Sequence, residues 1–430
     1  MTVPKTADVV VIGGGIVGAA TARAIAFRGA SVVLIEKESE PAREGSGRAQ
    51  GSLRVQGRHA SELPLALEAL EMWKEAADEG DFEFVQGGNL YFQTTPEESS
   101  VLAHLVKEAH GAGLKEVELL TPDRVREIMP EATGPFLGAM WSPIDAQAQP
   151  DISTKYFARK AKDAGAMLCF GVKATRLYAV RGEIAAVETS AGTIATNRVV
   201  LAGGVWTPYL AHTVGVKVPL MPVVMSELET AAMPPIFSQT IRAFGFGARQ
   251  RPNGRTVISA GLNAKVGHDV TLADFNGLKF WLPRAMSFRK ALKLRLDLPR
   301  TLRQVARFST LDTSLIPDTS PEPRVDKPLV DTSLTRMAKV IPAYQDAKIE
   351  RRWAGLVDMT PDGLPIIDDS PGVDGLTIIT GLAGHGLHLG PVLGEIGAEL
   401  ALNETKSRPI DHLSLARFSS GSVSKPEMMI

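Results

Sequence analysis

The chain has 430 residues, with 47 basic against 48 acidic side chains and a formal net charge of -1, so its overall charge does not indicate nucleic-acid binding. Its single cysteine, Cys169, excludes an internal disulfide and is expected to be an inert residue of a buried strand, and no Cys/His cluster has metal-site spacing. No apolar run reaches transmembrane length, and residues 1–10 lack the apolar core of a signal peptide. We therefore expect a globular, cytoplasmic protein of about two to three domains, without a metal or a nucleic-acid partner.

Residues 9–38 predict a strand, a glycine turn, a helix and a second strand. The turn carries Gly13, Gly15 and Gly18 at the spacing G-x-G-x-x-G. The first glycine permits the turn, the second lets the backbone approach a pyrophosphate, and the third lets the helix pack closely on the sheet. Glu36 ends the second strand, where a carboxylate would bind an adenosine ribose. The unit predicts dinucleotide binding without distinguishing FAD from NAD.

The next segments are a polar loop rich in glycine and arginine over residues 39–58 and two predicted helices. The first helix follows Ser61 as its N-cap and places four apolar residues on one face. The second covers residues 96–111. The apolar face of the first helix consists of Leu63, Leu67, Leu70 and Trp73.

Two later segments repeat the pattern of an apolar strand followed by a glycine turn. They are residues 197–210, NRVVLAGGVWTPYL, and residues 375–402, in which Gly390 and Pro391 suit a helix start. Between them the pattern changes to strands mixed with basic and proline-rich pieces. The chain therefore predicts an α/β fold of two domains: a discontinuous Rossmann-like domain and a second domain with a mixed or antiparallel sheet. The expected boundaries are 1–85, 141–213 and 350–430 for the first domain, and 86–140 and 214–349 for the second, with a basic insert at about 265–335.

These segments, in this order, resemble the D-amino-acid oxidase superfamily of FAD-dependent oxidoreductases. SGRAQGSLR at 46–54 and RRWAGLVDMTPDGLPII at 351–367 look like segments of the sarcosine oxidase β subunit. RVVLAGGVWTPYL and the insert after Ala260 are more similar to bacterial L-amino-acid deaminases. The resemblance implies bound FAD and oxidation of a C–N bond in an amino acid or N-alkyl amino acid. Hydride passes to the flavin, and the resulting imine hydrolyses.

The resemblance also implies which residues bind FAD. The glycine turn and Glu36 hold the ADP half, the loop after Arg43 reaches the pyrophosphate and ring, and Val172 meets the adenine. The turn at 384–390 aims helix N–H groups at the flavin ring. The expected FAD-binding residues are Gly13, Gly14, Gly15, Ile16, Val17, Gly18, Glu36, Lys37, Arg43, Ser46, Gly47, Arg48, Ala49, Gln50, Gly51, Ser52, Val172, Ala202, Gly203, Gly204, Trp206, Gly355, Gly384, His385, Gly386, Leu387 and His388.

The chain departs from these relatives at positions that matter for chemistry. Pro150 and Gly355 stand where relatives attach flavin covalently, which predicts non-covalent FAD. Val357 stands in place of an arginine that clamps the substrate carboxylate, and His388 in place of a carboxylate-binding lysine. The position matching a lysine that activates dioxygen falls near Val257, which favours a dehydrogenase over a fast oxidase.

Candidate catalytic residues follow from the missing clamp. His388 would be a weaker, pH-dependent cation, and His385 would lie beside the flavin. Arg54, or Arg58, would supply a cation, with a solvated surface arginine as the alternative for each. Trp353 is expected to pack rather than line the site, and packing is also the more frequent role for a tryptophan at 206.

Residues 279–307 carry nine Lys or Arg against one Asp, interleaved with apolar residues. Such a stretch can lie on an anionic membrane surface or dock a partner, but the preferred interpretation is a solvated helix pair broken by Pro283 and Pro299. The corresponding location is the cytoplasm or the inner face of the membrane. The electron acceptor is expected to be oxygen, a quinone or a partner protein. A flavin-holding subunit that needs a partner and an NAD(P)-dependent enzyme are the alternative functions.

Overall fold

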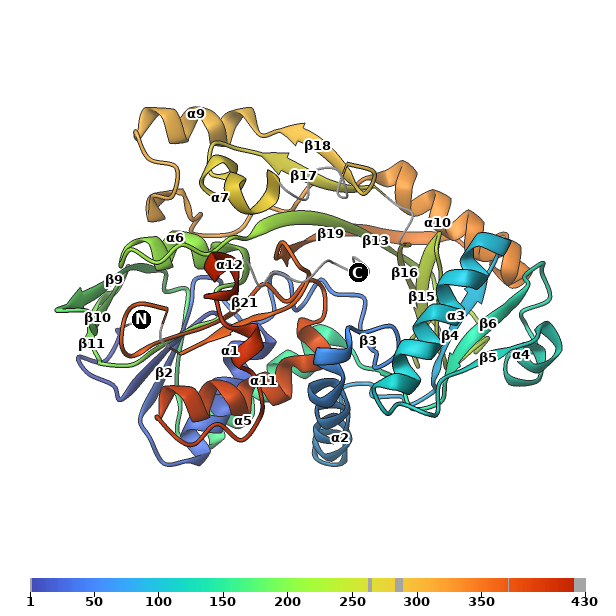
Figure 1. Ribbon diagram of the computed structural model, residues 1–430, viewed down its shortest axis with the longest axis horizontal. Helices are drawn as coiled ribbons and strands as arrows, with labels where there is room; N and C mark the ends of the chain where they lie inside the picture. Colours follow the sequence, from blue (N-terminus) through green and yellow to red (C-terminus); the bar gives the residue numbers. More distant parts are fainter. Residues whose placement is uncertain (1, 262–264, 283–288, 370, 421–430) are drawn as a thin grey trace.

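The computed structural model describes residues 2–261, 265–282, 289–369 and 371–420, and two large sheets organise it (Figure 1). The six-stranded sheet has the order β20-β21-β12-β1-β2-β8, and all neighbours are parallel except β20 and β21. The predicted α/β fold with a Rossmann-like sheet and a second, mixed sheet is confirmed. The strands of the first sheet are β1 Val9–Ile12, β2 Val32–Glu36, β8 Met167–Phe170, β12 Val199–Leu201, β20 Ile366–Asp368 and β21 Leu376–Thr380.

Both faces of the six-stranded sheet are buried, which explains its uninterrupted aliphatic strands. Alternate residues of β1 and β2 join different cores: Val9 and Val11 pack with helices, while Val10 and Ile12 pack toward a three-stranded sheet. The helices are α1 Ile16–Phe27, α2 Leu63–Glu79, α5 Pro150–Asp163 and α11 Gly386–Ala401, and the three-stranded sheet consists of β9 Ala174–Val180, β10 Glu183–Thr189 and β11 Gly192–Ala195.

Glycines in α11 set the close packing of this helix on α1. A Cβ atom at Gly394 would lie 2.5 Å from the Cβ of Ala20, and one at Gly397 would lie 2.8 Å from the Oγ1 of Thr21. Real Cβ atoms do not approach neighbours so closely, so both positions require glycine at this helix separation. The packing holds the N-terminal ends of α1 and α11 side by side (Figure 1).

The second sheet has ten strands and mixes both orientations. Its order is β18-β17-β13-β16-β15-β14-β4-β6-β5, and β19 pairs antiparallel with β13 over nearly the full length of both strands. The strands are β4 Asn89–Gln93, β5 Glu118–Leu120, β6 Gly138–Ser142, β13 Met221–Thr230, β14 Thr240–Ala243, β15 Phe246–Gln250, β16 Thr256–Ala260, β17 Val266–Val270, β18 Leu292–Leu296 and β19 Ile349–Met359. A short ladder, β3 Ser52–Leu53 with β7 Ala146–Gln147, links the sheets.

The pairing of β19 changes one expected boundary. Residues 350–359 were expected in the Rossmann-like domain, but they form a strand of the ten-stranded sheet. Sequence pattern did not show this, because the pairing partner lies more than a hundred residues away. We therefore propose that the boundary lies after Met359, and the other boundaries remain predictions.

The remaining helices lie mainly around the second sheet. They are α3 Pro96–Gly111, α4 Pro122–Ile128, α6 Thr207–His212, α7 Asp274–Trp281, α9 Leu298–Ala306, α10 Lys327–Val340 and α12 Arg417–Ser420. The predicted helix over residues 96–111 is confirmed, and a capping box of Thr95 and Glu98 begins it.

Two expected helix starts were wrong. Helix α11 begins at Gly386, directly after Gly384 in the left-handed region (φ 82°), and Pro391 lies inside the helix. Helix α2 begins at Leu63 after a short 3-10 turn capped by His59, so Ser61 is not its N-cap.

The basic insert extends the ten-stranded sheet beyond β13 by two strands and adds two helices beside them (Figure 1). Helix α7, strands β17 and β18 and helix α9 compose it, so the preferred interpretation of a simple helix pair is wrong. Pro299 begins α9 instead of breaking a helix, while Pro283 lies outside the described residues.

Candidate active site

A large cavity lies between the carboxyl ends of the six-stranded sheet and one face of the ten-stranded sheet. Most of the residues expected to bind FAD line it. The exceptions are Gly18 and Gly47, where an added Cβ would collide with the backbone carbonyls of Gly13 and Ala42, and His388. The expected residues in the lining are Gly13, Gly14, Gly15, Ile16, Val17, Glu36, Lys37, Arg43, Ser46, Arg48, Ala49, Gln50, Gly51, Ser52, Val172, Ala202, Gly203, Gly204, Trp206, Gly355, Gly384, His385, Gly386 and Leu387.

The glycine turn after β1 forms one end of the cavity. The Gly14 N–H donates to Glu36 Oε2 at 2.5 Å, and the Ile16 N–H donates to Ser46 Oγ at 2.9 Å. A Cβ at Gly15 would meet the same Ser46 hydroxyl at 3.0 Å. Burial raises the pKa of Glu36 to about 7. A bare backbone cradle at a helix N-terminus beside a carboxylate fits the diphosphate and ribose of an ADP group.

A polar cluster that the sequence did not predict closes this end. Lys37 Nζ donates to Glu44 Oε1 at 2.7 Å and to Ser320 Oγ at 2.6 Å, and Trp206 donates its ring N–H to Glu44 at 3.0 Å. Four residues near the end of the insert thereby become part of the cavity wall: Ile316, Ser320, Pro321 and Pro323. Ser320 contacts Lys37 across 283 residues of sequence, and no local pattern predicts such a contact.

The opposite end of the cavity is formed by the turn before α11. Asp358 on β19 accepts hydrogen bonds from the Gly381 N–H at 2.7 Å and from the Thr380 hydroxyl at 3.1 Å. These bonds fix the turn, so that Gly384 and Gly386 line the cavity at the helix start. The N-terminus of a sixteen-residue helix favours negative charge on a bound group.

The two histidines near this turn have different surroundings. His385 lines the cavity, and its Nδ1 lies 3.0 Å from the buried carboxylate of Glu62, yet burial lowers its pKa to about 4. His388 lies outside the lining, with Nδ1 2.8 Å from the Arg54 carbonyl, and burial lowers its pKa well below the usual value. The expectation that His388 is a cation facing the substrate is therefore corrected, because both rings are neutral at pH 7.

Three arginines provide positive charge instead, two of them buried and the third, Arg242, half-buried. Arg54, Arg58 and Arg242 line the cavity. Arg54 and Arg58 are 7% and 8% exposed, so neither is the solvated surface residue of the alternative interpretation. Burial lowers the pKa of each, but a guanidinium remains protonated at neutral pH. Buried Asp145 accepts the Val55 N–H at 3.0 Å and so fixes the loop that carries Arg54. Arg242 on β14 was missed, because its strand has no local signature.

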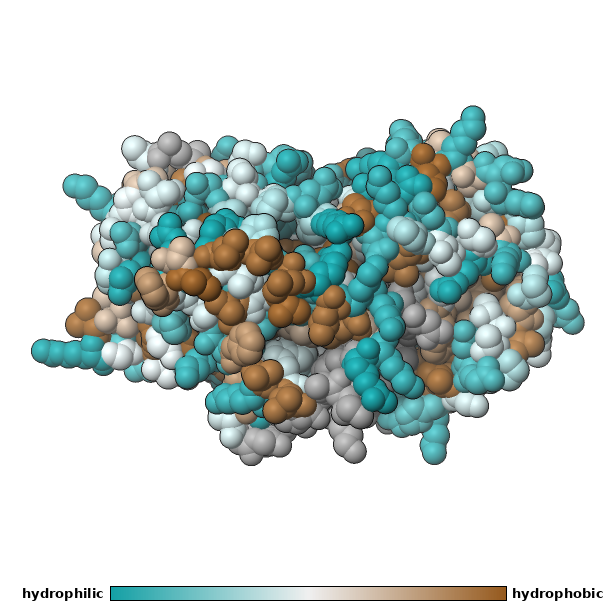
Figure 2. All heavy atoms as spheres, turned by 90° about the horizontal axis from the view of Figure 1, so that it is seen from above, coloured by the Kyte–Doolittle hydropathy of each residue, from teal (hydrophilic) through white to brown (hydrophobic). Residues whose placement is uncertain are grey.

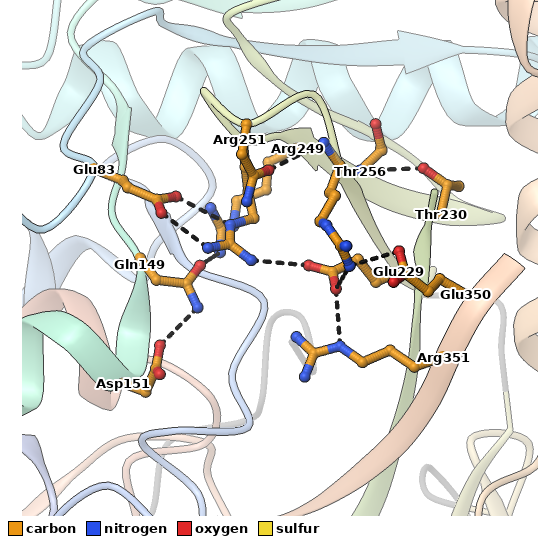
Figure 3. Close-up of polar contacts among 12 residues, drawn as sticks. Glu83, Gln149, Asp151, Glu229, Thr230, Arg249, Arg251, Thr256, Glu350 and Arg351 are labelled. Carbon is orange, nitrogen blue, oxygen red and sulfur yellow. Dashed lines mark hydrogen bonds and ion pairs between the residues drawn. The ribbon is translucent and has the colours of Figure 1, made fainter. Parts of the chain in front are cut away.

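Hydrogen bonds from residues of the ten-stranded sheet hold the loop of residues 46–52. Arg249 on β15, which is 1% exposed, donates to the Gln50 carbonyl and to Gln149 Oε1, the latter at 2.7 Å (Figure 3). Arg48 donates to the Ala354 carbonyl at 3.1 Å and accepts the Trp353 ring N–H at 3.0 Å through its own carbonyl. Trp353 itself is absent from the lining, whereas Trp206 is part of it. The second sheet thus determines the shape of the loop.

Comparisons with known proteins support an FAD site in this cavity. Residues 8–400 match the family described as FAD dependent oxidoreductase. Glycine oxidase of Geobacillus kaustophilus is 26% identical, with 95% of this chain and 97% of the relative covered. Sarcosine oxidase subunit beta of an Arthrobacter species is 24% identical, with 97% and 92% covered.

A solved structure gives the same arrangement. The L-amino acid deaminase of Proteus vulgaris has a TM-score of 0.85 and 25% identity, with 97% of this chain and 98% of that chain covered. For the form of that protein with its specific insertion sequence deleted, the TM-score falls to 0.76. The family match and the glycine cradle together identify this chain as a member of the FAD dependent oxidoreductase family, an enzyme that uses FAD.

Proposed function

We propose that the enzyme oxidises the C–N bond of an amino acid or N-alkyl amino acid. The observation that carries the proposal is a group of three arginines at the end of the cavity away from the glycine turn: Arg54 and Arg58, which are buried, and the half-buried Arg242. Buried guanidinium groups bind carboxylates strongly, and an amino-acid substrate carries one. The relatives named glycine oxidase, sarcosine oxidase and L-amino acid deaminase support the same substrate class.

The side chains contribute binding and orientation. Arg242, Arg54 and Arg58 would hold the carboxylate, and the walls between the sheets would exclude water. Bound FAD supplies the acceptor for the hydride that leaves the substrate carbon. Gly355 lines the cavity where a covalent attachment residue would stand, which supports non-covalent FAD.

The test is the visible spectrum of the purified protein, followed by anaerobic titration with sarcosine, proline and the D- and L-amino acids. We expect a yellow protein that releases its flavin on acid precipitation and is bleached by at least one of these compounds. A yellow protein that is bleached only in the presence of other subunits from lysate would instead support the partner-dependent flavoprotein. A flavin that no amino acid reduces, with or without lysate, would contradict the proposal.

The insert supports a second part of the proposal, a contact with an anionic membrane surface. Apolar side chains of the insert face outward (Figure 2), and α9 has Leu298, Leu302 and Val305 on one exposed face, 53%, 58% and 53% exposed. A helix of a globular protein normally turns this face inward. The other strongly exposed apolar residues of the insert are Phe275, Leu278, Leu282, Leu294, Leu296 and Phe308.

Charge complementarity favours a membrane over another apolar surface. Lys293, Arg303 and Arg307 are exposed and alternate in the sequence with these apolar residues, a composition that suits anionic headgroups. Among the described residues, no helix is long and apolar enough to cross a bilayer.

Co-sedimentation with phosphatidylglycerol-rich vesicles tests the contact. Replacing Leu294, Leu302 and Val305 by serine should weaken binding at least about tenfold, because each buried apolar side chain contributes roughly 1.5 to 3 kcal/mol. Serine at Phe27, Leu137 and Val180, which are equally exposed elsewhere, is the matched control and should leave binding unchanged. Equal binding by both triple variants, or no binding by the parent protein, would contradict the contact.

A further inference from the structure

A carboxyl group with one unpartnered oxygen lines the cavity from the ten-stranded sheet. Glu227 lies on β13, is 5% exposed, and its Oε2 has no hydrogen-bond partner among the described residues. Glu227 nevertheless lines the cavity. A buried polar atom without a partner is costly, so one that faces a binding cavity indicates a contact with the ligand.

Glu227 belongs to a row of paired residues that crosses four strands. Backbone pairing joins Glu227 to Ser259, Ser259 to Gly247, and Gly247 to Arg242. All four residues line the cavity. Neighbouring strands are about 4.8 Å apart, so the Cα atoms of Glu227 and Arg242 lie roughly 14 Å apart.

The two middle residues of this row, Ser259 and Gly247, have small side chains. A Cβ at Gly247 would lie 2.9 Å from Ser259 Oγ and 3.2 Å from Gln50 Nε2, so the loop of residues 46–52 lies directly over the row. Arginine and glutamate side chains reach far enough to shorten the span between the ends of the row to the size of an amino acid. One end of the row is therefore cationic and the other carries a carboxyl group, which matches the two charged ends of such a substrate.

The charged neighbours of Glu227 are bound to other groups. Glu229, two residues along β13, accepts from Arg251 at 3.0 Å and from Arg351 of β19 at 2.8 Å (Figure 3). Arg249 of β15 is bound to Gln149 and to the Gln50 carbonyl. Burial raises the pKa of Glu227 to about 8, and Arg249 and Arg351 oppose that rise. A carboxylate with such a pKa is a far better proton acceptor than an exposed one.

We propose that Glu227 binds the amino end of the substrate and accepts its ammonium proton before oxidation. One N–H bond breaks, its electron pair stays on nitrogen as the lone pair that hydride departure needs, and the proton forms an O–H bond on the carboxylate. The proposal deepens the proposed function and rests on its substrate class, because it requires an amine at the end of the row opposite Arg242.

Binding of two ligands of the same shape tests this in the FAD-loaded enzyme. α-Aminoisobutyrate has no hydrogen on its α carbon and cannot be oxidised, while pivalate has a methyl group in place of the ammonium group. Replacing Glu227 by Gln should weaken α-aminoisobutyrate binding about 10- to 100-fold and change pivalate binding less than about twofold. In the parent enzyme, α-aminoisobutyrate should bind more tightly as the pH rises toward 8, since Glu227 is protonated below its pKa. This rise should be absent in the Glu227→Gln variant.

Glu350→Gln is the control, because it removes the same charge from an exposed position of β19. Flavin content and melting temperature of both variants check folding. The role of Glu227 would be overturned if Glu227→Gln weakened the binding of both ligands equally. It would also be overturned if the variant kept the parent enzyme's preference for α-aminoisobutyrate over pivalate. The proposed function has its own test, because it is contradicted if no amino acid reduces the flavin of the parent enzyme. In that case, comparing the binding of α-aminoisobutyrate and pivalate would still show whether Glu227 binds an amine.

Discussion

The two ends of the cavity are built in different ways. The end at the glycine turn comes largely from one continuous segment, in which Gly13, Gly15 and Glu36 lie within 24 residues of one another. The proposed substrate end comes from β13, β14, β15 and β16 and from the loop that carries Arg54, and strand pairing aligns the residues of the four strands. A local motif can therefore identify the cofactor, while the residues that we propose for substrate recognition are brought together only by the folded sheet.

The largest expected effect comes from the local end. In Gly18→Ala the new Cβ would collide with the Gly13 carbonyl, and Gly13 is itself confined to a left-handed φ of 114°. The turn must then open, and we expect loss of bound FAD together with a lower melting temperature. Absorbance near 450 nm per protein measures the flavin.

Gly111→Ala is the control for this change. Gly111 ends α3, where nothing lies within 4 Å of an added Cβ, so the control should keep its FAD and gain up to about 1 kcal/mol of stability. If Gly18→Ala retains full flavin content, the glycine turn does not require the close approach that the fold shows.

A smaller effect is expected at the substrate end. Arg242→Met keeps the length of the side chain but removes its charge, and should weaken pivalate binding about 10- to 100-fold while leaving FAD bound. Arg176→Met, on an exposed position of β9, is the control and should have no effect. Loss of FAD in Arg242→Met would show that this end of the cavity also contributes to FAD binding, which would contradict the proposed division between a cofactor end and a substrate end.

The same contrast explains what the sequence could predict. The Rossmann-like unit and helix α3 follow from patterns within short windows of the sequence, whereas the role of the loop at 46–52, of which all residues except Gly47 line the cavity, was implied by the family resemblance. Arg242, Glu227 and Ser320 could not be found in this way, because each matters only through a partner 60 or more residues distant or through a strand register. His388 was expected to be a pH-dependent cation, but burial lowers its pKa, and the sequence gives the residue type without its surroundings.

The smallest expected effect concerns the join between the insert and the nucleotide end. Arg300 of α9 lies 5.0 Å from the ring centre of Trp206 and 5.2 Å from that of Tyr209, and its guanidinium donates to the Tyr209 hydroxyl at 2.5 Å. Cation–π contacts of this kind contribute about 0.5 to 2 kcal/mol. Arg300→Ala should therefore lower the melting temperature by only a few degrees.

Two quantities should be measured for Arg300→Ala: its affinity for FAD and its binding to vesicles. Trp206 donates to Glu44, and Glu44 holds Lys37, so releasing Trp206 loosens the wall at the ADP end and should weaken FAD binding several-fold. Arg303→Ala, one turn along the same helix, removes an equal charge without a ring contact and should affect vesicle binding alone. If both variants weaken FAD equally, general charge rather than the Arg300 contact connects the insert to the cofactor. If only Arg300→Ala does, the insert is a structural part of the nucleotide end, and a membrane contact made by α9 would reach the cofactor through these two rings.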